Sequence, residues 1–261
     1  MNTSNEDLKL ALHLADTADA ITMASFGKLQ AWTNKSDGSP VSEIDRAVEE
    51  ALANKIATLG SGDSILGEER AADGATSSIL PQGRQWVIDP IDQTRHYLRG
   101  NLEYATLISL LIDGRPAVSV VSSPALGVRW WASRGQGAYK NGAPLHVSQV
   151  TKIEDAYLSV AGIREWHSEW KYDELVKMIN RSSYPAGSAG GFLQQMMVAE
   201  GLIDIFVEPW GEVWDHVGPS LIIEEAGGCS TTLVGGPPHG GSLVATNGVL
   251  HKESLQYLVR V

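Results

Sequence analysis

One stretch of this sequence decides how the rest is interpreted: Gln85-Trp86-Val87-Ile88-Asp89-Pro90-Ile91-Asp92. Its first four residues are mostly apolar and predict a β-strand that ends directly in acidic residues. Pro90 stiffens the turn and biases Asp89 towards an extended backbone, so Asp89 and Asp92 are held close together. Carboxylates at that range repel unless a cation lies between them. The turn is therefore either a site for Mg²⁺ or Mn²⁺, which prefer oxygen ligands, or a solvated acidic turn.

Two other acidic positions favour the cation site. Glu68 and Glu69 close a short apolar run, Ser64-Ile65-Leu66-Gly67, which predicts another strand. Asp215 follows Trp214 at the start of an apolar helix, where it is either a ligand or an ordinary N-terminal cap. Because a sheet fixes the backbone while side chains at strand ends reach solvent, such positions suit a precise site.

The first half of the chain is expected to contain helices followed by a sheet of several strands. The helical spacing of apolar residues predicts the helices, and Ser42 and Asp45 have capping-box spacing. Asp113-Gly114 lies between two apolar runs and predicts a hairpin. The expected helices are 5–26 and about 42–56, and the expected strands are 64–67, 85–88, 104–112, 117–122, 129–132 and 137–139.

From residue 156, strands and helices alternate. The expected strands are 156–160, 203–207, one near 231, and 243–245, and the expected helices are 170–179, 191–201, 215–226 and one from 251. The pattern changes near Ser148–Glu154. We therefore expect an α+β half over residues 1–150, which holds the metal site, and an α/β half over 151–261 that completes it in one compact unit.

Composition excludes several classes of function. The formal net charge of −11, with no dense Lys/Arg cluster, argues against a nucleic-acid binder. No apolar run reaches the roughly 18 residues of a membrane span, and the N-terminus lacks the features of a signal peptide. The single cysteine, Cys229, excludes an intrachain disulfide and fits a reducing compartment. We expect a cytoplasmic protein that binds neither nucleic acid nor membrane.

Four short motifs stand in order along the chain: Gly67-Glu68-Glu69, Asp89-Pro90-Ile91-Asp92-Gln93-Thr94, Trp214-Asp215 and Glu225-Ala226-Gly227-Gly228. Together they resemble the inositol monophosphatase family of Mg²⁺-dependent, Li⁺-sensitive phosphatases. Further matches are Lys35, Ser39-Pro40-Val41, Asp45 and residues 135–142. The resemblance runs nearly end to end. It implies a layered αβαβα sandwich, of mixed α+β and α/β type, like that of inositol monophosphatase and fructose-1,6-bisphosphatase.

The resemblance implies a role for each residue of the site. The implied metal ligands are Glu68, Asp89, the Ile91 carbonyl, Asp92 and Asp215; the implied catalytic residues are Asp45, Thr94 and Glu69; and the implied phosphate or substrate contacts are Gln93, Thr94, Gly191 and Glu208. Two or three Mg²⁺ ions, or Mn²⁺ as a substitute, would lower the pKa of bound water and offset phosphoryl charge. Asp45 and Thr94 would orient and activate that water. Main-chain N–H groups at a helix start would hold the phosphate.

The implied activity is hydrolysis of a small phosphate monoester, either inositol monophosphate or histidinol phosphate, by a homodimer. Much of the chain, including Arg129-Trp130-Trp131-Ala132, resembles the histidinol-phosphatase branch found in actinobacteria. That branch has a Tyr-Gly-Asp element where this chain has Ala189-Gly190-Gly191. The missing carboxylate would remove a partner for a cationic amino group, so the identity of the substrate stays open.

A second departure lies inside the metal motif. Gln93 replaces the family glycine, and a positive φ there would strain glutamine by about 1 kcal/mol or more. Next to it, His96 is either a surface residue or a substrate contact. These departures fit an alternative function, a catalytically weak or inactive relative that binds a phosphorylated metabolite or a partner protein. A 3′-phosphonucleotide or fructose-1,6-bisphosphate phosphatase would share the metal motifs but would need a basic patch for its second phosphate.

Overall fold

The chain forms two compact units in a computed structural model, Met1–Arg134 and Gly135–Val261. The structure describes residues 5–29, 31–35, 38–59, 62–72, 74, 78–169 and 172–258. The boundary between the units precedes the one expected near residue 150. That the two halves make one compact unit stays a prediction.

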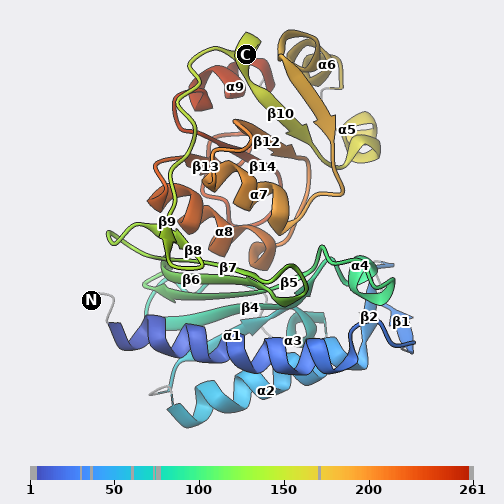
Figure 1. Ribbon diagram of the computed structural model, residues 1–261, viewed down its shortest axis with the longest axis vertical. Coiled ribbons are helices and arrows are strands. Elements are labelled where there is room, and N and C mark those ends of the chain that lie inside the picture. Colours follow the sequence, from blue (N-terminus) through green and yellow to red (C-terminus); the bar gives the residue numbers. More distant parts are fainter. Residues whose placement is uncertain are drawn as a thin grey trace. The chain divides into compact units, whose positions relative to one another are not determined.

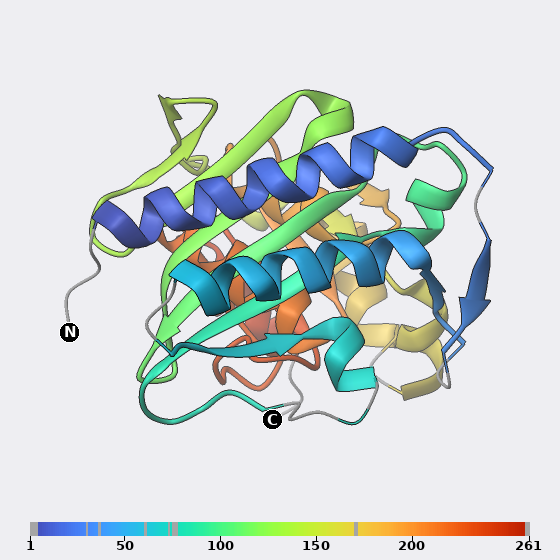
Figure 2. The ribbon, with the colours of Figure 1, turned by 90° about the horizontal axis from the view of Figure 1, so that it is seen from below.

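The first unit packs two long helices on one face of a sheet. Figure 2 shows α1 (Asn5–Ser25) and α2 (Glu43–Leu59) side by side across this face. Within the unit the strand order is β3-β4-β5-β6-β7, with β3 parallel to β4 and the other pairs antiparallel. The strands are β3 (Ser64–Gly67), β4 (Arg84–Asp92), β5 (Ala105–Ile112), β6 (Arg115–Ser123) and β7 (Val128–Ser133). The core between helices and sheet includes Leu14, Leu52, Trp86 and Val120.

Short elements at the ends of these strands escaped the sequence analysis. They are the hairpin strands β1 (Trp32–Asn34) and β2 (Pro40–Ser42) and the five-residue helices α3 (Glu68–Ala72) and α4 (Thr94–Leu98). Each is too short to show a period in the sequence. The two long helices and the five strands of the sheet lie where the sequence predicted them, with boundaries that differ by a few residues.

The second unit has a five-stranded mixed sheet between helices. The strand order is β11-β10-β12-β14-β13, with β10 parallel to β11 and β12 and the remaining pairs antiparallel. Figure 1 shows α7 and α8 on one face of this sheet and α6 and α9 on the other. The strands are β10 (Tyr157–Val160), β11 (Tyr184–Gly187), β12 (Ile205–Glu208), β13 (Cys229–Thr231) and β14 (Leu243–Thr246), and the helices are α5 (Ile163–Glu169), α6 (Tyr172–Arg181), α7 (Phe192–Ala199), α8 (Val213–Glu225) and α9 (His251–Leu258). A hairpin of β8 (Ala138–Lys140) and β9 (Ala143–Pro144) precedes them.

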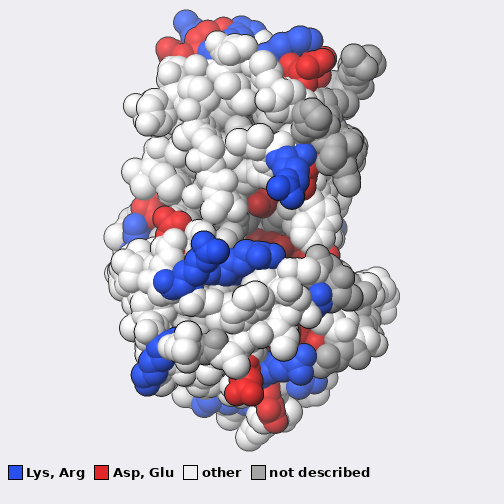
Figure 3. Space-filling model, turned by 90° about the vertical axis from the view of Figure 1, so that its right-hand side faces the viewer, with Lys and Arg blue, Asp and Glu red and all other residues white. Residues whose placement is uncertain are grey.

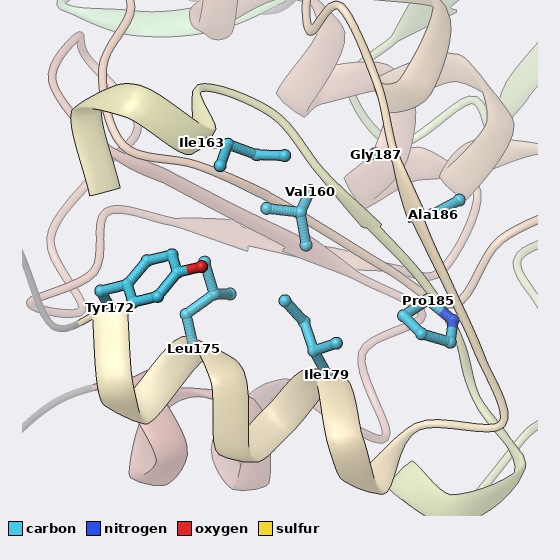
Figure 4. A pocket seen from close by; sticks show the side chains of 8 residues that line it. All are labelled: Val160, Ile163, Tyr172, Leu175, Ile179, Pro185, Ala186 and Gly187. Atoms are coloured by element: carbon cyan, nitrogen blue, oxygen red, sulfur yellow. The ribbon is translucent and has the colours of Figure 1, made fainter. Parts of the chain in front are cut away.

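An apolar pocket of about 200 Å³ lies beside the edge strand β11 (Figure 4). Val160 of β10, Leu175 and Ile179 of α6, and Pro185 of β11 line it. The hydroxyl of Tyr172 is the one polar side-chain group among the labelled residues, and none of these residues is a carboxylate. The pocket therefore does not suit a metal ion.

Charged side chains are mixed on the surface. On the face in Figure 3, Lys and Arg form several separate groups, with Asp and Glu close to some of them. In the described ranges, no helix combines the length and the apolar character needed to cross a membrane.

Candidate active site

The acidic turn of the first unit lies in a β-bulge. The register of β4 against β5 shifts between Asp89 and Asp92, which re-aims the side chains on either side of Pro90. Asp89 and Asp92 are only 2% and 8% exposed, and one carboxylate oxygen of each lies within 4.8 Å of the other. The Ile91 N–H donates to Asp89 Oδ1 over 3.0 Å. Two buried carboxylates this close repel without a cation, so this oxygen donor set fits Mg²⁺ or Mn²⁺.

Glu68 and Glu69 begin α3 directly after β3, which runs parallel to β4. Lys35 lies between them, with its Nζ 2.7 Å from one oxygen of each carboxylate. Burial by itself would lower the pKa of Lys35, but the two carboxylates outweigh it and raise that pKa. Burial raises the pKa of Glu69 to about 7, and Lys35 opposes the rise.

Glu49 supports this acidic end of the sheet, and the sequence analysis missed it. Its carboxylate accepts hydrogen bonds from the main-chain N–H groups of Glu69 at 2.8 Å and Arg70 at 3.0 Å, so it caps α3. Gly67 makes room for it, because a β-carbon there would lie 2.4 Å from Glu49 Cδ. The available signal was its position one helical turn after Asp45, on the buried face of α2.

Asp45 and Thr94 form the hydrogen-bonded pair that the resemblance implied. Thr94 Oγ1 lies 3.2 Å from Asp45 Oδ1 and 2.9 Å from the Ile91 carbonyl oxygen. The N–H and hydroxyl of Ser42 both donate to Asp45 Oδ2, at 2.8 and 2.5 Å, which confirms the capping spacing at the start of α2. Burial raises the pKa of Asp45, and the hydrogen bonds from Ser42 oppose that rise.

Gln93, between this pair and the acidic turn, has a left-handed backbone. Its φ is 65° and its ψ is 46°. The family glycine therefore stands at a position that needs a positive φ, and glutamine there costs about 1–2 kcal/mol. The side chain of Gln93 is partly exposed.

The departures that follow Gln93 make local contacts. Arg95 Nη2 donates to the Gly38 carbonyl over 3.0 Å, which ties α4 to the β1–β2 hairpin. His96 Nδ1 lies 3.2 Å from the Glu103 carbonyl oxygen. These contacts give both side chains a structural role within the first unit.

In the second unit, Asp215 is the third residue of α8 and helps to cap it. Its Oδ2 accepts the Glu212 N–H over 2.7 Å. Pro219 lies inside the helix, where it has no N–H to give to the Asp215 carbonyl. The side-chain amide of Gln195 on α7 donates to that carbonyl over 3.0 Å. Gln195 thus replaces the helical hydrogen bond that Pro219 removes at the Asp215 carbonyl, and no sequence pattern indicated this contact.

Glu208 ends β12, and its carboxylate Oε2 lies 3.4 Å from Nε2 of His216 on α8. Gly191 precedes α7 with φ 79° and ψ −163°, a region that essentially only glycine occupies. An aspartate with this backbone would be strained.

The Glu225-Ala226-Gly227-Gly228 motif has a structural role. Glu225 ends α8, and its two carboxylate oxygens accept the N–H groups of Gly135 at 2.8 Å and Gly137 at 2.9 Å. Gly228 is packed so closely that a β-carbon would lie 2.5 Å from the Thr246 carbonyl oxygen. Two of the matching segments therefore hold each other in place within the second unit.

Buried carboxylates at strand ends, beside a threonine–aspartate pair, are the groups of a metal-assisted hydrolase. The chain matches the inositol monophosphatase family over residues 4–261. It is 43% identical to a histidinol-phosphatase of Mycobacterium tuberculosis, with 98% of both chains covered, and 40% identical to one of Streptomyces coelicolor, with 97% of both covered. Its structure is similar to that of inositol monophosphatase II from Staphylococcus aureus, with a TM-score of 0.85 at 25% identity over 98% and 96% of the two chains.

The chain therefore belongs to the inositol monophosphatase family, and it is a phosphatase. The α/β sandwich predicted from the sequence is confirmed. These comparisons favour an enzyme over the inactive binding protein considered above.

Proposed function

We propose that this phosphatase hydrolyses histidinol phosphate with the help of Mg²⁺. The observation that carries the proposal is the buried Asp89–Asp92 pair with Thr94 and Asp45 hydrogen-bonded beside it. Full-length relatives at 43% and 40% identity carry the name histidinol-phosphatase, which supports this substrate. Inositol monophosphate is the second candidate, supported by the likeness to solved inositol monophosphatases.

Glu68, Asp89, the Ile91 carbonyl, Asp92 and Asp215 would hold two or three Mg²⁺ ions, or Mn²⁺ in their place. Bound there, the metal would polarise the phosphoryl group and lower the pKa of water. Lys35, in contact with both Glu68 and Glu69, would keep these carboxylates oriented. The bulge in β4 would fix the backbone of Asp89 and Asp92.

The other residues would handle the proton and the substrate. By passing its hydroxyl proton to Asp45, 3.2 Å away, Thr94 would be able to accept a proton from an attacking water. Glu69 would assist catalysis from its ion pair with Lys35, which it shares with Glu68. The main-chain N–H groups of Gln93 and Thr94 would hold the phosphate, while Gly191 and Glu208 would contact the rest of the substrate.

Phosphate release tests the proposal directly. Purified protein is incubated with histidinol phosphate, inositol 1-phosphate, a sugar phosphate and 3′-phosphoadenosine phosphate, with Mg²⁺ and with chelator. We expect Mg²⁺-dependent release that is fastest from histidinol phosphate. No release from any of these by folded protein would refute the proposed activity, and a preference for inositol 1-phosphate would select the second candidate.

We further propose a cytoplasmic homodimer. The single cysteine supports the location. The edge strand β11 supports the assembly: Tyr184 on it is 60% exposed, and its ring centroid lies 5.2 Å from that of Tyr157, which is 49% exposed. An exposed aromatic edge suits pairing with a second copy. Light scattering should give a dimer mass that Tyr184→Glu lowers and that Leu202→Glu, a control at another exposed apolar residue, does not. A monomeric wild type would contradict this.

A further inference from the structure

Glu208 is a partly buried carboxylate with a single basic neighbour. Its side chain is 14% exposed, and His216 Nε2 lies 3.4 Å from its Oε2. Within the described parts of the chain, His216 is the only basic residue that lies within ion-pair distance of Glu208. Part of the carboxylate therefore remains available to a cation from outside the protein.

The packing around the pair fixes both side chains. A β-carbon on Gly190 would lie 2.3 Å from Glu208 Oε1, and one on Gly211 would lie 2.4 Å from His216 Nε2. Gly211 has no positive φ, so the space it leaves for the imidazole, rather than its backbone, accounts for glycine here. Neither ring nor carboxylate can move towards these glycines.

His216 itself is buried at a cost. Its side chain is fully buried, and Nδ1 has no hydrogen-bond partner among the described residues. A buried polar atom without a partner costs about 1–3 kcal/mol, and an apolar side chain would avoid that cost. The contact with Glu208 is the polar contact that His216 makes and that an apolar side chain could not make.

We propose that His216 is a positioning residue: it holds the Glu208 carboxylate so that the exposed part of that carboxylate binds the cationic amino group of an amino-alcohol monophosphate. The inference rests on the proposed function, because it takes Glu208 as a substrate contact. This positioning role also fits the glycine at residue 191. Because Gly191 supplies no carboxylate, binding of the amino group depends more on the orientation of Glu208. Glu208 thus becomes the residue that selects an amino group over an uncharged one.

The test separates a positioning role from a structural one. His216→Leu keeps the volume but removes the donor, and His216→Gln restores a donor near the Nε2 position. For histidinol phosphate, we expect His216→Leu to raise KM about tenfold or more with kcat little changed, and His216→Gln to recover most of this. KM for glycerol 2-phosphate, which has no amino group, should stay within about twofold.

Further variants separate the positioning role from a general loss of folding. Gly211→Ala leaves His216 in the sequence but displaces its ring, so it should raise the same KM. Its β-carbon would also lie 3.3 Å from Asp215 Oδ2, so the comparison is made between the KM values of the two substrates rather than in kcat. Gly187→Ala is its control, because a β-carbon there meets only ordinary contacts at 3.7 Å. His251→Gln is the control for a buried histidine of the same unit, bonded to Thr231 and Thr246. It should lower stability without changing either KM. In a Glu208→Gln background, His216→Leu should have no additional effect.

Calorimetric binding of histidinol phosphate keeps this inference separate from the proposed activity. If the wild type binds without turnover and His216→Leu weakens binding, the activity is refuted and the positioning role stands. If the wild type turns over and His216→Leu matches His251→Gln in KM and Kd, the positioning role is overturned. Equal losses for the amino substrate and for glycerol 2-phosphate, or no binding at all, would overturn it as well.

Discussion

The candidate site residues of the two units are held in place in different ways. In the first unit, main-chain N–H groups help to hold two carboxylates: Asp89 accepts that of Ile91, and Asp45 accepts that of Ser42 together with the Ser42 hydroxyl. In the second unit, side chains add to the main-chain N–H that Asp215 accepts from Glu212: Gln195 bonds the Asp215 carbonyl, and His216 faces Glu208. A carboxylate held by main-chain groups depends less on the identity of its neighbours. A site fixed by side chains can be tuned from a neighbouring residue.

Asp92→Asn should have the largest effect and would sharpen this contrast. It removes a charge from the metal site while leaving the bulge intact, so the loss should be chemical rather than structural. We expect kcat/KM to fall by about a thousandfold, since a metal contributes several kcal/mol and each 1.36 kcal/mol is tenfold. Phosphate-release kinetics and Mn²⁺ binding by calorimetry measure the two effects.

The control is Asp113→Asn in the β5–β6 turn. Asp113 also accepts a main-chain N–H, that of Gly83 at 2.9 Å, through an oxygen that asparagine retains. It should match the wild type in rate and metal affinity. Wild-type kinetics in Asp92→Asn would show that the metal site lies elsewhere.

Thr94→Val should give the next largest effect and separates proton handling from metal binding. Valine keeps the shape but removes the hydroxyl that bonds Asp45 and the Ile91 carbonyl. Loss of a positioned acid–base group costs about 10²–10⁴-fold in kcat. Mn²⁺ affinity should change little, and Thr94→Ser should restore most of the rate. A loss of metal affinity as large as that of Asp92→Asn would contradict the separate role of Thr94.

Gln195→Leu probes the support by side chains in the second unit. It removes the side-chain donor to the partly buried Asp215 carbonyl, which should lower the free energy of unfolding by about 1–3 kcal/mol in urea titrations. Adding Pro219→Ala supplies a main-chain N–H four residues after Asp215 and should recover most of the loss.

Gln194→Leu is the matched control, because the neighbouring Gln194 has a buried Oε1 with no partner among the described residues. Its stability should be unchanged or slightly higher. If Pro219→Ala fails to rescue Gln195→Leu, then Gln195 supports α8 by packing rather than by this hydrogen bond.

Sequence patterns were sufficient for those parts of the site that depend on local geometry. A strand that ends in Asp89-Pro90-Ile91-Asp92 and a helix that starts with Ser42 and Asp45 each carry their signal within a few residues. The resemblance added the pairing of Asp45 with Thr94, which are far apart in the sequence.

The contacts that sequence patterns missed all join distant elements. Glu49 caps α3 from α2, and Gln195 on α7 compensates for Pro219 on α8. No local period marks such residues, because the backbone group that each one satisfies belongs to another segment. A buried polar residue on an apolar helix face is the usable signal, and it does not name the partner.

Gln93→Gly should have the smallest effect, and it tests the one place where main-chain support is itself strained. Among described non-glycine residues with positive φ, Asp113 and Asn141 are of types that tolerate this region, whereas Gln93 is not. Relief of about 1–2 kcal/mol of strain, less about 0.4–1 kcal/mol for the more flexible unfolded chain, should stabilise the protein by about 0.5–1 kcal/mol. Gln93→Ala keeps the β-carbon and therefore the strain, so it should leave stability unchanged.

The kcat values of the two variants separate the side chain from the backbone. If both variants raise kcat equally, the glutamine side chain crowds the phosphate; if only Gln93→Gly raises kcat, the backbone limits the rate. A destabilised Gln93→Gly would mean that the side chain contributes more than its strained backbone costs.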